Sequence, residues 1–269
     1  MSEETVFQAA QCLADAWEDR DTIDFPVDLL PADREEAYAI QDQVARLIAV
    51  DDTNAVVGWK VGATSPSFQQ AEGYDGPVPG RIFASTLYHS PALIPLAVCP
   101  YAKLEAEISF VLTTDLDPYH YPFSREDLAK IVALQPAFDV TSTRYDPATR
   151  KRWNKMQNML AGIADNGNGG AVVIGAELED WYGISLMNLN VELRMNGAAP
   201  VSNLFGEYRG GPFEALVWTI NSVCKRGFGF SAGDAILTGS LTEPKVLQKG
   251  DQAAAHYPGI GEMSVVFSS

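Results

Sequence analysis

The sequence predicts an α+β fold, in which a helical N-terminal segment precedes a core of mixed or largely antiparallel strands. Apolar residues recur at helical spacing near the N-terminus, and from Val56 onward they form short runs separated by Gly and Pro. The chain lacks the regular alternation of strand and helix that a parallel sheet requires. We therefore expect a helical segment at residues 1–55, packed on a β-rich domain at residues 56–269.

Two helices are expected in the N-terminal segment. The apolar residues of the first helix are Ala9, Ala10, Leu13, Ala14 and Trp17, at helical spacing. The second helix is predicted to begin near Asp33, because Glu36 follows at the position that completes a capping box. Its apolar stripe is Ala37, Ile40, Val44, Leu47 and Ile48. Stripes of this kind are typical of helices that pack on a core.

The β-rich part contains short apolar or alternating runs that predict strands. In order, these runs are VVGWKVG, RIFAST, LEAEISFVL, FDVTST, AVVIG, NLNVELRMNG, DAILTGSL and GEMSVVF. The Asn196-Gly197 pair at the end of the sixth run predicts a hairpin turn.

Two further helices are expected between these strands. Ser124 is predicted to cap a helix over Leu128–Leu134, which Pro136 would end. Pro212 is predicted to open a second helix, with Gly227 just beyond its last turn.

Composition excludes several classes of protein. The formal charge is −16, from 35 acidic and 19 basic residues, so the basic surface that nucleic-acid binding needs is not expected. The three cysteines, Cys12, Cys99 and Cys224, form no C-x-x-C motif and suggest neither a disulfide framework nor a zinc knuckle. We see no secretory signal and no apolar run of about 18 residues, and we expect a cytoplasmic protein without a membrane partner.

The run LEAEISFVL at residues 104–112 carries two glutamates inside an apolar strand. In a strand, the residues on one face would be Leu104, Ala106, Ile108, Phe110 and Leu112. Glu105 and Glu107 would share the opposite face, with Cα atoms roughly 6.5–7 Å apart. Both carboxylates could then bind one Mg²⁺ ion, which prefers oxygen ligands. The alternative is that the two glutamates are only the solvated face of the strand.

A third carboxylate favours the metal site. Asp139 interrupts an apolar stretch after Pro136. The histidines, His89, His120 and His256, show no H-x-H or H-x-x-x-H spacing, so Mg²⁺ or Mn²⁺ is favoured over zinc.

Lys60 is the remaining chemical candidate. It lies between Trp59 and Val61 in an apolar strand flanked by glycines. It is either a cation beside the acidic site, able to bind a carboxylate or move a proton, or an edge lysine whose amine reaches water. We find no G-x-S-x-G motif, catalytic cysteine context, dinucleotide-binding loop or P-loop.

Several separated stretches together resemble one family. The stretches GWKVGATS, LEAEISFVL, QPAFDV, IADNGNGGAVVIG, GGPFEALVW, DAILTGSL and GD…AHYPGIGEMSVVF resemble, in order, the hydratase/decarboxylase branch of the fumarylacetoacetate hydrolase superfamily. That branch contains 2-hydroxypenta-2,4-dienoate (2-keto-4-pentenoate) hydratases and 4-oxalocrotonate decarboxylases of aromatic catabolism. The resemblance covers nearly the whole chain.

The resemblance implies a fumarylacetoacetase-like β-roll with a mixed, curved sheet, and usually a homo-oligomer. It implies a divalent metal held by Glu105, Glu107 and Asp139, and an active-site lysine at Lys60. The positions that it assigns to the pocket for a small 2-oxo acid are Thr238, Gly239, Asp165 and Asn166.

Three positions depart from the family pattern. The family usually reads DFG where this chain has Val78-Pro79-Gly80, so an aspartate assigned to acid–base chemistry is missing. Asn168 stands where the family usually has Ser, and Asp139 stands where this branch usually has Glu. The changes at positions 78 and 168 bear on the substrate and on the reaction, whereas Asp is usual at the third metal position elsewhere in the superfamily.

The expected function is that of a metal-dependent lyase on 2-oxo or 2-hydroxydienoic acids, most directly hydration of 2-hydroxypenta-2,4-dienoate or a relative. Three alternatives stay open: decarboxylation of a 4-oxalocrotonate-like acid, C–C hydrolysis of an acylpyruvate, and a non-catalytic relative that binds a small acid. Hydrolysis usually requires a His–Glu pair on a lid helix, and the matching stretch SPSFQQAEGYDGP has Glu72 but no His.

Overall fold

The computed structural model describes residues 1–204 and 211–268. Two long helices lead the chain. Helix α1 (Glu3–Asp19) begins where the Ser2 side chain accepts a hydrogen bond from the Thr5 amide. Helix α2 (Arg34–Ile48) begins at Asp33, whose side chain accepts from the Glu36 amide. The Glu36 carboxylate accepts from the Ala32 amide instead of the Asp33 amide, so only one half of the predicted capping box forms.

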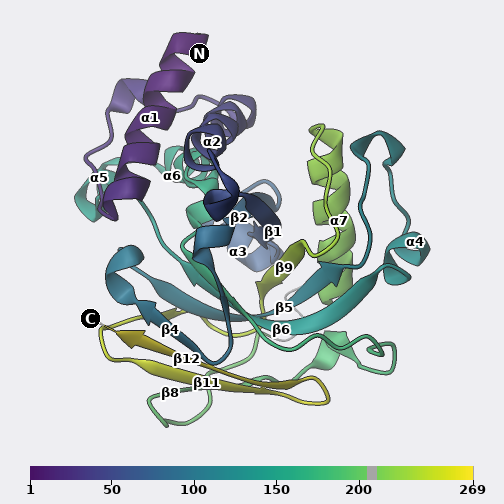
Figure 1. The fold of residues 1–269 in the computed structure, drawn as a ribbon. Helices are drawn as coiled ribbons and strands as arrows, with labels where there is room; N and C mark the ends of the chain where they lie inside the picture. The colour runs from purple at the N-terminus through teal and green to yellow at the C-terminus, as the bar shows by residue number, and fades with distance from the viewer. Residues whose placement is uncertain (205–210, 269) are drawn as a thin grey trace.

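The shorter helices follow later in the chain. Their bounds are α3 (Pro66–Glu72), α4 (Arg125–Ala129), α5 (Pro147–Arg152), α6 (Lys155–Ala164) and α7 (Gly211–Lys225). Helices α1, α2, α5 and α6 gather on one side of the molecule (Figure 1). The α1 and α2 stripes share one cluster with residues from far along the chain, including Phe83, Tyr145 and Trp153. The helical segment at residues 1–55 therefore packs on the rest of the chain. The domain boundary at residue 55 stays a prediction, since the cluster contains residues from both sides of it.

Eight strands form the larger sheet, in the order β2-β1-β9-β5-β6-β7-β3, with β10 pairing to β5. Their bounds are β1 (Val56–Gly62), β2 (Val78–Phe83), β3 (Leu87–His89), β5 (Lys103–Leu112), β6 (Val132–Thr141), β7 (Ala171–Ile174), β9 (Ala235–Ser240) and β10 (Lys245–Val246). The pairs β1–β9 and β3–β7 are parallel and the other pairs are antiparallel, so the predicted mixed sheet is confirmed.

A second sheet has the order β4-β12-β11-β8 and lies beneath β5 and β6 (Figure 1). Its strands are β4 (Ala92–Pro95), β8 (Glu192–Met195), β11 (Gln252–Tyr257) and β12 (Gly261–Ser268). Its inner residues share the main core cluster with the apolar face of β5 and with α7. The Tyr257 hydroxyl donates to the Ala137 carbonyl at 2.7 Å and ties the two sheets together.

The predicted helix over Leu128–Leu134 is wrong. Helix α4 ends at Ala129, and β6 begins at Val132 and runs through Pro136. Strand β6 is buried on both faces, and its mostly apolar run does not distinguish helix from strand. Pro136 is tolerated because the β6–β7 pairing begins only at the next residue.

The other local predictions fare better. Asn196 and Gly197 have φ values of 51° and 70° and form a turn, but β8 is shorter than the predicted run and pairs with β11, and no strand follows the turn in residues 198–204 to complete the predicted hairpin. Helix α7 ends near Gly227, which has φ 86° as expected beyond a last turn. The first residue of the motif GGPFEALVW, Gly210, lies outside the described residues. No helix in the described ranges is long and apolar enough to cross a bilayer.

Candidate active site

The three predicted carboxylates lie together on the larger sheet. In β5, the residues that face the main core are Leu104, Ala106, Ile108, Phe110 and Leu112. Alternation places Glu105 and Glu107 on the other face. The antiparallel register pairs Glu105 with Asp139 of β6. One carboxylate oxygen from each of the three residues lies within 4.8 Å of the others. We call Glu105, Glu107 and Asp139 the acidic cluster.

The acidic cluster is shielded from water. Glu107 and Asp139 are 1% and 2% exposed, and Glu105 is partly exposed. Burial, and next the charge of Asp139, raise the pKa of Glu105 to about 7. Burial, and next the charges of Asp139 and Glu105, raise the pKa of Glu107 well above its usual value. Like charges brought this close inside a protein resist ionisation unless a cation joins them.

Lys60 of β1 supplies one positive charge. Its ammonium forms a salt bridge with the Asp139 carboxylate, and the residue is 3% exposed. Burial lowers the pKa of Lys60, but Asp139, then Glu105 and Glu107, raise it by more, so the net pKa lies above the usual value. Lys60 therefore stays protonated beside the cluster at neutral pH.

The Lys60–Asp139 salt bridge depends on the curl of the sheet. Strands β9 and β5 separate β1 from β6. On a flat sheet these three steps would place the two strands about 14 Å apart, too far for this contact. The larger sheet must therefore be concave on the side that carries Lys60 and the acidic cluster. Within the sheet, Gly58 lets β1 lie close to β9, because a Cβ atom there would lie 2.1 Å from the Ala235 carbonyl oxygen.

The residues of the cluster fit a hard divalent cation. Their donors are all carboxylate oxygens, which suit Mg²⁺, Ca²⁺ or Mn²⁺. Asp139 Oδ1 is buried and has no hydrogen-bond partner within the described residues. Buried polar atoms rarely lack a partner, and this oxygen points to a missing ligand. With three carboxylates against one ammonium, a divalent cation would also balance the charge.

Thr238 and Gly239 lie next to the cluster on β9. The Gly239 amide donates to Glu107 Oε2 at 2.7 Å and fixes the orientation of that carboxylate. The Thr238 hydroxyl donates to the Ile108 carbonyl at 2.8 Å, beside a register shift between β5 and β9. Thr238 is fully buried, and its hydroxyl is directed at β5. Contact of these two residues with a substrate stays a prediction.

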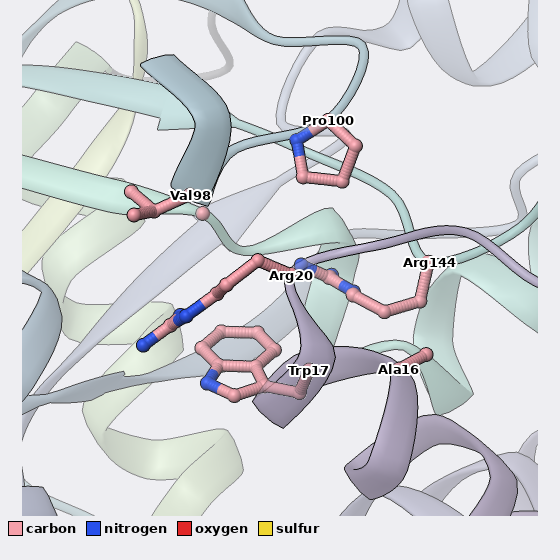
Figure 2. Close-up of a pocket in the computed structure, with 7 residues that line it drawn as sticks. Ala16, Trp17, Arg20, Val98, Pro100 and Arg144 are labelled. Atoms are coloured by element: carbon pink, nitrogen blue, oxygen red, sulfur yellow. The ribbon is translucent and has the colours of Figure 1, made fainter. Parts of the chain in front are cut away.

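Asp165 lies in a second buried ion pair, with Arg144. Asp165 accepts from Arg144 Nε at 2.5 Å, from the Arg144 amide at 3.0 Å and from the Thr143 hydroxyl at 3.2 Å. The Arg144 guanidinium also stacks over Trp17, 4.5 Å from the ring centroid. A pocket beside Arg144 and Arg20, at the end of α1, contains no residue of the acidic cluster (Figure 2). Substrate contact of Asp165 also stays a prediction.

Asn166 clamps β2 to the loop after α6. Its side chain accepts from the Arg81 amide at 2.7 Å and donates to the Arg81 carbonyl at 2.8 Å. Its own carbonyl oxygen would lie 2.3 Å from a Cβ atom on Gly80. Gly80 is the register partner of Lys60, so these contacts hold the part of β2 that pairs with the lysine. Any substrate contact of Asn166 stays a prediction.

Sequence patterns did not point to the buried arginines Arg81 and Arg144. Each is at most 5% exposed, and Arg81 forms a salt bridge with Asp42 of α2, whereas Arg144 forms one with Asp165. A signal was present, because Arg81 opens the strand-like run RIFAST and Arg144 directly follows the run FDVTST, where a buried charge is unexpected. Their partners are distant in sequence and could not be assigned from spacing.

The comparisons with known proteins agree on one family. The fumarylacetoacetate (FAA) hydrolase C-terminal family matches residues 83–267. A 2-keto-4-pentenoate hydratase of Paraburkholderia xenovorans (strain LB400) is 30% identical, over 87% of this chain and 84% of its own. A 2-hydroxyhexa-2,4-dienoate hydratase of Comamonas testosteroni is also 30% identical, over 87% and 86%.

Solved structures share the fold. The structure of 4-oxalocrotonate decarboxylase from Pseudomonas putida G7, complexed with magnesium and adipate, superposes with a TM-score of 0.87. The two chains are 22% identical, and the match covers 99% of this chain and 98% of the other. Fumarylpyruvate hydrolase from Pseudomonas aeruginosa, with Mn²⁺ and pyruvate, matches over 78% and 88% at 16% identity, with a TM-score of 0.52. The chain therefore belongs to the fumarylacetoacetate hydrolase family, in the lyase branch that contains the 2-keto-4-pentenoate hydratases.

Proposed function

We propose that this protein is a divalent-metal-dependent hydro-lyase that adds water to a 2-hydroxydienoic acid, such as 2-hydroxypenta-2,4-dienoate. The acidic cluster with its unpartnered Asp139 oxygen carries this proposal. The activities named for the curated relatives at 30% identity support it.

Glu105, Glu107 and Asp139 would hold the cation, and Mg²⁺ is the ion that we propose, with Mn²⁺ as a substitute. When bound, the cation supplies a Lewis acid for the carboxylate and 2-oxygen of a 2-oxo acid. The Gly239 amide keeps Glu107 in the ligating orientation. A 2-oxo acid is therefore the substrate class that this donor set favours.

Lys60 is the residue that we assign to proton transfer. Its ammonium lies against Asp139 and stays protonated because of the carboxylates around it. From there it can offset negative charge that develops on the substrate, or donate a proton to it. Val78 stands where the family usually has an aspartate. It packs among apolar residues and has no ionisable group, so proton transfer depends more strongly on Lys60.

A buried apolar cluster adjoins the acidic cluster and suits the hydrocarbon part of a dienoate. Ala137 pairs with Glu107 across β5 and β6, and Leu237 pairs with Ser109 across β5 and β9. Both belong to a small apolar cluster with Ile82, Val172, Ile174 and Ala235. A substrate with one charged end and an apolar chain matches a site in which a metal-binding cluster adjoins an apolar cluster.

Decarboxylation of a 4-oxalocrotonate-like acid is the second candidate. The same electron sink would serve loss of CO₂, and the fold likeness to the decarboxylase spans almost the whole chain. We favour hydration because the relatives at higher identity are hydratases. Hydrolysis of an acylpyruvate is disfavoured by the lack of His in the stretch around α3.

The test is a parallel assay of both reactions with Mg²⁺. The purified protein is given 2-hydroxypenta-2,4-dienoate, and loss of its ultraviolet absorbance is followed together with the 4-hydroxy-2-oxo acid product. CO₂ release from 4-oxalocrotonate is measured beside it. Metal-dependent product formation supports the hydratase. CO₂ release alone would favour the decarboxylase, and tight Mg²⁺ binding with neither reaction would favour a non-catalytic binder. The cytoplasmic location and the homo-oligomer stay predictions.

A further inference from the structure

An unusual acceptor lies on the loop that follows α6. The Asn168 side-chain oxygen, Oδ1, is buried and has no hydrogen-bond partner in residues 1–204 and 211–268. Asn168 has φ 54°, a left-handed conformation that Asn adopts more readily than most residues. Buried polar atoms without a partner are rare, and at a site they indicate a ligand or a water molecule.

The Tyr74 hydroxyl lies close to the same amide. Gly162 of α6 shows this, because a Cβ atom there would lie 3.1 Å from the Tyr74 hydroxyl oxygen and 3.1 Å from Asn168 Nδ2. The Asn168 Oδ1 atom would lie 3.7 Å from the same point. Two atoms that each lie 3.1 Å from one point are at most 6.2 Å apart, so the Tyr74 hydroxyl and the Asn168 amide are close enough for one water molecule to bridge them beside Gly162. The described part of the chain shows no hydrogen bond from the Tyr74 hydroxyl.

Tyr74 and Asn168 lie on the Lys60 side of the site. Gly80 pairs with Lys60 and touches the carbonyl of Asn166, two residues before Asn168. The Lys60 charge also acts on Tyr74: burial raises the pKa of the Tyr74 phenol, and Lys60 is among the cations that oppose the rise. The net pKa is raised, so the phenol keeps its proton at neutral pH and can donate it in a hydrogen bond.

We propose that Tyr74 and Asn168 form a neutral polar subsite that binds the water molecule added to the substrate, an inference that rests on the proposed hydratase function. A hydroxyl and an amide each offer a donor and an acceptor, as water does. A carboxylate only accepts, and it would face the unpartnered Asn168 oxygen. The subsite therefore favours water over a second carboxylate group of the substrate.

The subsite serves the second of two steps, the addition of water. The dienol first tautomerises: the 2-hydroxyl loses its proton and C5 gains one, which gives the 2-oxo-3-enoate. The water oxygen then bonds to C4, and the electron pair of the C3–C4 double bond moves toward the 2-oxygen. The proton that the water oxygen loses is taken up at C3 as the 2-oxo group re-forms, so the net change is addition of H₂O.

Each partner has a defined part in that step. The water molecule donates one hydrogen bond to Asn168 Oδ1 and accepts one from the Tyr74 hydroxyl. Its remaining lone pair is then free to attack C4. Neither residue is needed for the earlier tautomerisation, because the water oxygen takes no part in it.

The test separates tautomerisation from water addition in Tyr74→Phe and Asn168→Gly. Glycine tolerates the positive φ at position 168, and Tyr119→Phe, which removes a hydroxyl from a side chain that is 92% exposed, is the control. In D₂O with Mg²⁺, deuterium uptake at C5 reports tautomerisation, and the 4-hydroxy-2-oxo acid reports water addition. Circular dichroism confirms that each variant is folded, and calorimetry with oxalate measures binding of a chelating acid.

We expect both subsite variants to lose water addition by about 10²-fold, the usual cost of displacing a reacting group by about 1 Å. Deuterium uptake and oxalate affinity should stay within about twofold of the unmodified protein, and Tyr119→Phe should match it throughout. Water addition at the unmodified rate in folded Tyr74→Phe and Asn168→Gly would overturn the subsite. Equal loss of deuterium uptake and water addition would also overturn it. An unmodified protein without metal-dependent water addition would instead overturn the proposed function.

Discussion

The Lys60–Asp139 and Arg144–Asp165 ion pairs are buried to the same extent but are bonded very differently. In both pairs the base is 4% exposed and the acid 2%. Both oxygens of Asp165 accept hydrogen bonds, and Arg144 donates further to the Gly169 and Ser142 carbonyls. Asp139 keeps one oxygen without a partner, beside two more carboxylates.

This difference separates framework from function. A buried charge with one opposite charge and a full set of hydrogen bonds holds loops in place and has little capacity left for a ligand. A buried cluster with surplus negative charge is unfavourable until a cation arrives, and this makes it a binding site. The same residue type, aspartate, serves both roles because its surroundings differ.

Glu107→Gln should abolish metal-dependent turnover. The amide offers a weaker ligand than the carboxylate, and loss of a residue that merely supports a ligand already costs about 10–100-fold. The metal-free variant should be at least as stable as the unmodified protein, because one of three crowded acids is gone. Titration calorimetry with Mg²⁺ and thermal unfolding check both expectations.

The control is Glu262→Gln, whose side chain is 83% exposed. It should leave activity and Mg²⁺ binding unchanged. Metal-dependent turnover by Glu107→Gln at the unmodified rate would contradict the site.

Arg144→Met should destabilise the fold by about 3–5 kcal/mol, since it leaves the Asp165 charge buried and unpaired. Burial raises the pKa of Asp165, and the contacts with Arg144 are the main effects that oppose this rise. Urea unfolding measures the change. Arg152→Met, which breaks an exposed pair with Asp24, should leave the free energy of unfolding nearly unchanged. Similar losses of unfolding free energy in the two variants would contradict a structural role for the Arg144–Asp165 ion pair.

Lys60→Ala should lower turnover by about 10²-fold or more, because it removes the group assigned to proton transfer. Mg²⁺ affinity should not fall, since an ammonium gives the cation no lone pair and its loss leaves the carboxylates more negative. Steady-state kinetics and calorimetry are compared, with Lys245→Ala as the partly exposed control. A parallel loss of turnover and affinity would mean that Lys60 is structural.

The pH dependence should differ with and without metal. Glu105 has its folded pKa raised from 4.5 to about 7, so its neutral form favours folding at low pH. Without metal, this contribution is lost as pH rises from about 5 through 7, and the melting temperature should fall. Saturating Mg²⁺ should remove that fall. Mg²⁺ affinity should weaken by up to about tenfold per pH unit below 7, because binding displaces a proton.

Thermal unfolding from pH 5 to 8, in a chelator and in Mg²⁺, makes this measurement. A melting temperature that rises over this range in the chelator would show that Glu105 is ionised without metal. The site would then have another way to balance its charge.

Local patterns predicted a large part of the fold. Alternation in β5 assigned its two faces correctly, because strand period follows from backbone geometry alone. Asp33 marked the start of α2 through a bond between near neighbours in sequence. The helix over residues 128–134 failed because both faces of β6 are buried, and this removes the periodicity on which prediction depends.

By itself, the sequence determined the strand of LEAEISFVL, the common face of its two glutamates and the need for oxygen ligands in a chain with few histidines. Tertiary structure alone decided which charges meet. The register of β5 on β6 brings Asp139 beside Glu105, and the curl of the sheet brings Lys60 across two strands. The tertiary structure also pairs Asp165 with Arg144, whereas one oxygen of Asp139 keeps no hydrogen-bond partner in the described residues. These outcomes depend on contacts between residues far apart in the chain, and spacing in sequence carries no information about them.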